Sequence, residues 1–156
     1  MLETVTVPKA DPTSYDFSSC ICFGIRKASR AITQICDDSL RSRGLRSTQF
    51  TILLTLAKQS PITIGRLADE LWVDPTALSR NLKPLLRKEL VKVQPGSDQR
   101  TRLVSLTETG EQEVAECFKL WEKNQENIAK IIPTDDIKNL QHALENLFKA
   151  LHEHNA

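Results

Sequence analysis

Positive charge and hydrogen-bond donors are concentrated in one segment of this 156-residue sequence. Residues 76–102 contain seven lysines and arginines but only two acidic side chains, a net charge of +5. The first 75 residues carry +1 and residues 103–156 carry −5, so the whole chain is nearly neutral at +1. Lysine and arginine bind phosphate oxygens, and a basic surface on a neutral or acidic body is typical of proteins that bind nucleic acid.

The donors best placed for specific hydrogen bonds lie at the start of a predicted helix. Asp74 suits the helix N-cap, and Pro75 suits the first helical position, where its missing N–H needs no partner. The spacing turns four leucines inward, namely Leu78, Leu82, Leu85 and Leu86. The outward side chains of the first turn and a half are Thr76, Ala77, Ser79 and Arg80. Arginine can donate two hydrogen bonds to guanine, and a methyl group can contact thymine. The alternative is an ordinary solvated helix face.

This helix, called the reading helix below, is flanked by elements that complete a recognisable module. Residues 64–71 form a short amphipathic helix before it, and two β-type runs, 91–93 and 103–105, follow it. The runs bracket a polar, basic hairpin tip at 95–102. Helix, turn, polar helix and basic wing together predict a winged helix-turn-helix that binds double-stranded DNA. We expect four basic side chains to contact phosphates without reading sequence: Lys83, Arg87, Lys92 and Arg102.

Helices with apolar stripes are predicted on both sides of the winged region. One covers residues 16–41, and two more lie within residues 107–154, separated by Pro133. Three such stripes cannot be buried on one small winged region, so we expect a homodimer in which they interlock. A dimer also places two reading helices one DNA turn apart, about 34 Å. The prediction is a mainly α fold with a small β-wing, a single domain spanning 1–156 whose DNA-binding region is 45–106.

Two cysteines near the start of the first helix form a Cys-x-Cys pair, Cys20 and Cys22. Amides at a helix start lower the pKa of a thiol and favour the reactive thiolate. Three interpretations stay open: the pair packs in the core, senses oxidants or electrophiles, or binds a metal or metalloid. Residues two apart on a helix point in nearly opposite directions, which disfavours chelation of one ion. Cys36 and Cys117 lie on apolar stripes and are predicted core residues.

Composition excludes several other classes of protein. No apolar run approaches the roughly 20 residues that span a bilayer, and no secretory signal is evident, so we expect a cytoplasmic protein that does not bind membranes. The sequence contains no Ser-His-Asp set, glycine-rich phosphate loop or paired acidic motif, so no enzyme and no cofactor is predicted. The three histidines follow no metal-ligand spacing with the cysteines, and no metal site is assigned.

From residue 16 to about residue 150 the sequence resembles the MarR (multiple antibiotic resistance regulator) family of transcriptional regulators. The resemblance rests on five motifs in a specific order: Leu45-Arg-Ser-Thr-Gln-Phe50, Ile64-Gly-Arg-Leu-Ala68, Val73-Asp-Pro-Thr-Ala-Leu-Ser-Arg80, Asp98-Gln-Arg100 and Leu106-Thr-Glu-Thr-Gly110. It implies a dimer that binds a pseudo-palindromic operator, usually represses, and is released by a small molecule or by thiol oxidation. One departure is Lys88-Glu89-Leu90, where the family commonly has glycine before the strand.

The resemblance also implies roles for individual residues. Arg100 would reach the minor groove beside the wing, where arginine favours narrow A·T-rich DNA, and Asp98 would position a wing arginine. The alternative for this pair is a loop ion pair without a role in DNA binding. A ligand pocket in the usual family location would lie between the winged region and the dimer helices. Its predicted lining is Phe23, Phe50 and Trp121. The rival functions are a metal- or metalloid-responsive regulator and a winged protein-interaction module.

Overall fold

The computed structural model describes residues 16–98 and 101–155. The 3-10 turns and helices are η1 (Phe17–Ser19), α1 (Ile21–Leu40), η2 (Arg41–Arg43), α2 (Ser47–Gln59), α3 (Ile64–Glu70), α4 (Pro75–Arg87), α5 (Glu108–Ile131) and α6 (Thr134–Asn155). The strands are β1 (Ile62–Thr63), β2 (Val91–Pro95) and β3 (Arg102–Leu106). The chain divides into two compact units, with the boundary between residues 34 and 35 inside α1. Among the described helices, none is long and apolar enough to cross a membrane.

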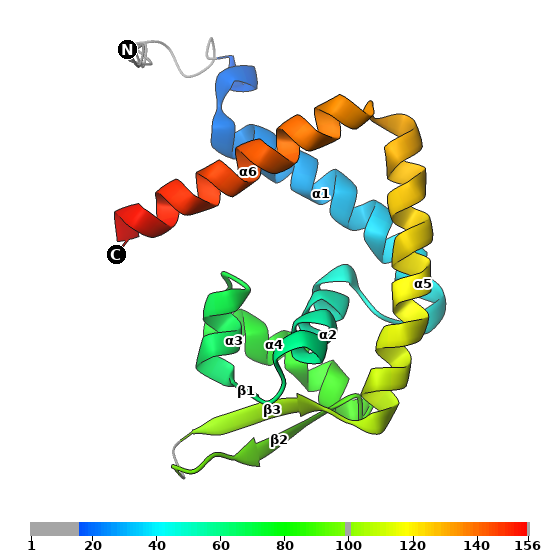
Figure 1. The fold of residues 1–156 in the computed structure, drawn as a ribbon, viewed down its shortest axis with the longest axis vertical. Coiled ribbons are helices and arrows are strands. Elements are labelled where there is room, and N and C mark those ends of the chain that lie inside the picture. Colours follow the sequence, from blue (N-terminus) through cyan, green and yellow to red (C-terminus); the bar gives the residue numbers. More distant parts are fainter. Residues whose placement is uncertain (1–15, 99–100, 156) are drawn as a thin grey trace. The chain divides into compact units, whose positions relative to one another are not determined.

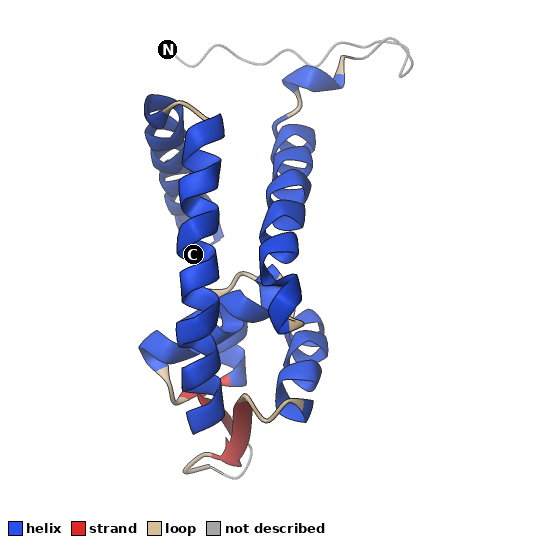
Figure 2. Cartoon of the chain, turned by 90° about the vertical axis from the view of Figure 1, so that its right-hand side faces the viewer, coloured by secondary structure: helices blue, strands red, loops and turns tan. Residues whose placement is uncertain are grey.

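The strands form one small antiparallel sheet with β3 in the middle. On one side Val104 of β3 pairs with Val93 of β2, and on the other with Ile62 of β1. The β2–β3 hairpin lies below α2, α3 and α4 in the view of Figure 1. In the described residues, strands are confined to this sheet (Figure 2). The predicted winged helix-turn-helix is therefore confirmed, with β1 as an addition.

The hydrophobic core lies where α2, α3, α4 and the sheet meet. Its most completely buried side chains include Leu53, Leu56, Leu67, Leu78, Leu85 and Val104. Leu86, predicted to point inward, is instead 38% exposed, because the core is already closed by the leucines at 78, 82 and 85. The first predicted helix also begins later than expected: Asp16 caps the turn η1, and α1 starts only at Ile21.

Three helical elements end in the same way, with one residue in the left-handed conformation. These residues are Gly44 (φ 62°), Trp72 (φ 49°) and Glu89 (φ 56°). After each of them, the next N–H bonds back to a carbonyl five residues earlier, as from Leu90 to Leu85 at 3.0 Å. Glu89 lies in the segment 88–90 that departs from the family resemblance, and it adopts the backbone conformation that favours glycine. At this helix-to-wing joint the left-handed position is therefore occupied by a glutamate.

Helix α5 begins in close contact with that joint. Thr107 caps α5, accepting a hydrogen bond from the Gly110 N–H at 3.0 Å, while its own N–H donates to the Leu90 carbonyl at 3.1 Å. A Cβ atom added to Gly110 would lie 1.9 Å from the Leu90 carbonyl oxygen. The start of α5 is therefore as close to the joint as backbone atoms allow, and only glycine fits at position 110.

An ion pair connects the turn after α1 to α5. The Arg43 guanidinium donates to Glu113, with Nε 2.9 Å from Oε1 and a second contact from Nη2 to Oε2. The Glu113 side chain is only 14% exposed. The hydrogen bond from Arg43 lowers the pKa of the Glu113 carboxyl below its usual range, so this side chain is an anion at neutral pH.

This ion pair predicts a specific pH dependence. The pKa of Glu113 is lower in the folded state than in the unfolded state. The ion pair therefore stabilises the folded protein fully above the unfolded-state pKa of about 4.3, and this stabilisation is lost as pH falls through the folded-state pKa. Chemical denaturation at pH 7 should show Glu113→Gln less stable than the wild type, and the difference should shrink progressively as pH is lowered below about 4.3. The exposed Glu126 provides the control, since Glu126→Gln should change little at any of these pH values. A deficit for Glu113→Gln that does not change as pH falls below about 4.3 would contradict the assignment.

Helix α6 is amphipathic, but none of its described side chains is fully buried within the chain. Leu144 and Leu147 are half-buried, and three other large apolar side chains are 40–50% exposed: Leu140, Phe148 and Leu151. Phe148 meets the ring of Trp72 edge-on, with centroids 5.9 Å apart. Much of the apolar stripe of α6 is therefore exposed in an isolated subunit.

Candidate nucleic-acid interface

The reading helix α4 starts at a strong N-terminal cap. Asp74 Oδ1 accepts hydrogen bonds from the backbone N–H groups of Thr76, at 2.8 Å, and Ala77, at 3.2 Å. The hydrogen bonds from Thr76 are the main cause of a lowered pKa at Asp74, and the charge of Arg80 contributes. The cap remains ionised at neutral pH and fixes the first turn of the helix, which confirms the predicted roles of Asp74 and Pro75.

The outward face of α4 carries most of the predicted base-reading side chains. Thr76, Ser79 and Arg80 are exposed, while Ala77 is half-buried. The Ser79 hydroxyl donates to the Pro75 carbonyl at 2.8 Å, so only its acceptor capacity is left for a ligand. Arg80 is therefore the strongest free donor among these four in the described structure. The helix continues through Pro84 to Arg87, so the proline lies inside α4 rather than at its end.

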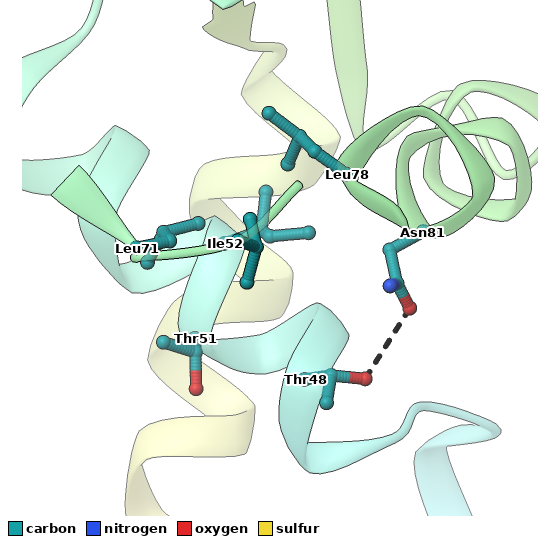
Figure 3. A pocket seen from close by; sticks show the side chains of 7 residues that line it. Thr48, Thr51, Ile52, Leu71, Leu78 and Asn81 are labelled. Atoms are coloured by element: carbon teal, nitrogen blue, oxygen red, sulfur yellow. Dashed lines mark hydrogen bonds between the residues drawn. The ribbon is translucent and has the colours of Figure 1, made fainter. Parts of the chain in front are cut away.

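A feature that sequence patterns missed lies on the flank of α4. The Asn81 amide donates to the Ala77 carbonyl at 3.0 Å, and its oxygen accepts from the Thr48 hydroxyl of α2 at 3.3 Å (Figure 3). The two residues border a cavity of about 210 Å³, whose other lining residues are Thr51, Ile52, Leu71, Val73 and Leu78. Its walls come from α2, from α4 and from the turn between α3 and α4. No motif marks these residues, because helical spacing does not show which helix faces which.

The wing presents further basic side chains. Lys92 is exposed on β2 opposite Ser105, and Arg102 is exposed at the start of β3 opposite Pro95. The hairpin tip is closed by backbone hydrogen bonds, from Thr101 to the Asp98 carbonyl at 2.9 Å and from Gly96 to the Thr101 carbonyl at 2.8 Å. The side chains of Lys83 and Arg87 are exposed on α4. Arg100 lies outside the described residues, so its contact with the minor groove stays a prediction.

The four cysteines lie in different environments. Cys22 is exposed in the first turn of α1, and Cys20, just before α1, is half-buried. Cys36 is half-buried, and burial raises the pKa of its thiol. Cys117 is fully buried, and burial together with the charge of Glu113 raises its pKa to about 12. Among the described residues, no three His, Cys, Asp or Glu side chains are grouped to hold a metal ion.

The three aromatic residues predicted to line one pocket lie in different settings. Phe50 is only 3% exposed and belongs to the hydrophobic core. Trp121 stacks on Phe118 with ring centroids 5.2 Å apart, and both rings are partly exposed on α5. The ring centroids of Phe23, near the start of α1, and Phe17 are 5.9 Å apart. None of the three borders the cavity at Asn81. Core burial leaves Phe50 little surface for a ligand.

Fold and site together define a winged helix-turn-helix protein. The sequence pattern of the MarR family matches residues 45–101. The transcriptional regulator MosR of M. tuberculosis, solved in complex with DNA, is 32% identical with a TM-score of 0.68, and the match covers 82% of this chain and 98% of MosR. A mutant MarR from E. coli complexed with operator DNA is 26% identical with a TM-score of 0.77, covering 86% of this chain and 99% of MarR.

A curated relative gives a similar result at the sequence level. The organic hydroperoxide resistance transcriptional regulator of Bacillus subtilis is 27% identical over 141 residues, covering 86% of this chain and 91% of that protein. The chain therefore belongs to the MarR family of transcriptional regulators.

Proposed function

We propose that this protein is a homodimeric transcriptional repressor that binds a pseudo-palindromic DNA operator through α4 and the wing. The observation that carries the proposal is the capped helix α4, which presents Arg80 outward beside the basic β2–β3 hairpin. Solved relatives in complex with DNA support the same function. Phosphate contacts from Lys83, Arg87, Lys92 and Arg102 supply affinity, while Thr76, Ala77, Ser79 and Arg80 supply base contacts. Such a regulator acts in the cytoplasm and needs no catalytic residue or cofactor.

The direct test is binding to the DNA upstream of the protein's own gene. The native protein should protect a pseudo-palindromic site there and bind it at least about 1,000-fold more tightly than a shuffled duplex of the same length. Equal affinity for the two duplexes would reject the proposed repressor. Absence of binding to either duplex would favour a protein-interaction module.

The dimer is proposed from the apolar stripe of α6, which its own chain leaves largely exposed. Leu144→Asp should convert the dimer to a monomer, because a carboxylate in an apolar contact has a large desolvation penalty. Asn139→Asp adds the same charge at an exposed position on α6 and should leave the dimer intact. Light scattering at micromolar concentration makes the comparison. A wild-type protein that is monomeric under these conditions would rule out the proposed assembly.

Release from DNA is proposed to follow from a small ligand or from thiol oxidation. The cavity of about 210 Å³ beside Asn81 is a candidate site for an organic ligand, since it combines apolar walls with hydroxyl and amide groups. The thiol route is supported by the exposed Cys22 and by the similarity to a regulator of organic hydroperoxide resistance. In that route the thiolate attacks the peroxide, becomes a sulfenic acid and leaves the peroxide reduced to an alcohol.

Thiol labelling of the native protein separates the two routes. Cys22 should react first and Cys117 last, because Cys117 is buried and its pKa is raised to about 12. Cys20→Ser and Cys22→Ser proteins should bind DNA normally but stay bound after peroxide treatment. If Cys22 reacts no faster than Cys36 and Cys117, and peroxide leaves the wild type on DNA, the thiol route is wrong and the ligand route remains.

A further inference from the structure

The turn between α1 and α2 is hydrogen-bonded to the C-terminal end of the reading helix. The Lys88 ammonium, one residue beyond the last helical position of α4, donates to the Gly44 carbonyl at 2.7 Å and to the Arg43 carbonyl at 3.2 Å. These two carbonyls lie at the C-terminal end of the turn η2, where backbone carbonyls lack an intrahelical partner. Two of the three ammonium donors are thus used within the protein.

The same turn is also attached to α5. The side chain of Arg43 forms the ion pair with Glu113, while its carbonyl accepts from Lys88. The turn η2, which follows α1, is therefore connected by its backbone carbonyls to Lys88 at the end of α4 and by the Arg43 side chain to α5. Because Lys88 and Arg43 are both cations, the Glu113 carboxylate lies where it compensates their charge, and both cations lower its pKa.

The backbone beside Lys88 is fixed by further contacts. Glu89 follows in the left-handed conformation, and its carbonyl accepts from the Thr107 hydroxyl at 2.6 Å. The next carbonyl, that of Leu90, accepts from the Thr107 N–H at 3.1 Å. The backbone next to Lys88 is therefore held in place by hydrogen bonds. The side-chain hydrogen bonds of Lys88 then fix the position of α4 relative to the turn η2.

We infer that Lys88 is a positioning residue for DNA recognition, which holds the reading helix at a fixed place relative to the end of α1. The inference rests on the proposed DNA-binding function. Lys88 belongs to the basic segment by charge, but its ammonium is bound to backbone carbonyls rather than left free for phosphate. Lys92, in contrast, makes no hydrogen bond or ion pair within the described part of the chain and serves as the phosphate-binding comparison. Loss of the Lys88 contacts should move the reading helix out of register with its half-site.

The test compares Lys88→Met with Lys92→Met in the full-length protein. Methionine keeps an unbranched apolar side chain and removes the ammonium in both. Affinities are measured for the upstream operator and for a shuffled duplex over a series of salt concentrations. For Lys88→Met, operator affinity should fall about fivefold or more. The affinity for the shuffled duplex and the slope of log K against log salt should stay unchanged. For Lys92→Met both duplexes should lose affinity, and the slope should become shallower by about 1.8 for a dimer.

Glu113→Gln gives a second variant, which removes no basic side chain. It weakens the other attachment of the same turn and should reproduce the operator-specific loss with an unchanged salt slope. Circular dichroism confirms that each variant is folded, and Lys88→Arg, which retains a donor, should recover part of the operator affinity if Lys88→Met is unstable. A shallower salt slope for Lys88→Met, or unchanged operator affinity for both Lys88→Met and Glu113→Gln, would overturn the inference. A wild type that binds no DNA would instead overturn the proposed function.

Discussion

Gly110→Ala is expected to lower the free energy of unfolding by about 3 kcal/mol, at the upper end of overpacking effects. The added methyl carbon would lie 1.9 Å from the Leu90 carbonyl oxygen, which is backbone at the joint between α4 and β2. This clash can be removed only if α5 moves away from the joint, because the Leu90 backbone carbonyl cannot rotate aside as a flexible side chain can. For a chain of this length the loss corresponds to a decrease of roughly 6–12 °C in the unfolding temperature.

Gly65→Ala is the matched control for this prediction. Gly65 also lies in a helix, but a Cβ atom there meets nothing within 4 Å. Alanine has a higher helix propensity than glycine, so Gly65→Ala should leave the free energy of unfolding unchanged or raise it by up to about 1 kcal/mol. Similar melting temperatures for Gly110→Ala and the wild type would show that the start of α5 is not held against the joint.

Arg80→Ala is expected to weaken operator binding by about 1–3 kcal/mol and to reduce the protein's preference for the operator over a shuffled duplex. Arg80 is exposed on the first turns of α4, and the Asp74 cap fixes the position of those turns. An arginine that donates two hydrogen bonds to guanine carries sequence information, and its removal leaves those base acceptors without a partner.

Lys92→Ala separates base reading from phosphate binding. Lys92 is exposed on β2 rather than on the reading helix, and should contact only the DNA backbone. Its removal should weaken operator and shuffled duplexes by the same factor. If Arg80→Ala behaved like Lys92→Ala, with equal losses on both duplexes, the proposed register of α4 in the major groove would be wrong.

The winged region was predictable from sequence because its cues are local. Asp74 and Pro75 mark a helix start within two residues, and the leucines at 78, 82 and 85 define a buried face by spacing alone. The two β-type runs around a polar tip likewise predicted the hairpin. Strand β1 was missed because it has only two residues and pairs with β3 some 40 positions later.

Other features depend on contacts between distant segments. By helix propensity alone, glycine at position 110 is a mild cost in the first turn of a helix, and only the approach of Leu90 shows why it is needed there. Lys88 counted as one more basic residue, since its carbonyl partners lie about 45 positions earlier in the chain. Phe50 was assigned to a pocket because an aromatic residue on an apolar stripe looks the same in a core and in a ligand site, and the structure places it in the core.

The most direct test of the DNA-binding function is the salt dependence of operator binding by the wild-type dimer. Each subunit has four proposed phosphate contacts, namely Lys83, Arg87, Lys92 and Arg102. For a dimer they predict that a plot of log K against log salt has a slope of about −7. The operator should also remain preferred over the shuffled duplex at every salt concentration. A slope near zero, or operator preference that is absent throughout the series, would contradict the proposal that α4 and the wing bind DNA.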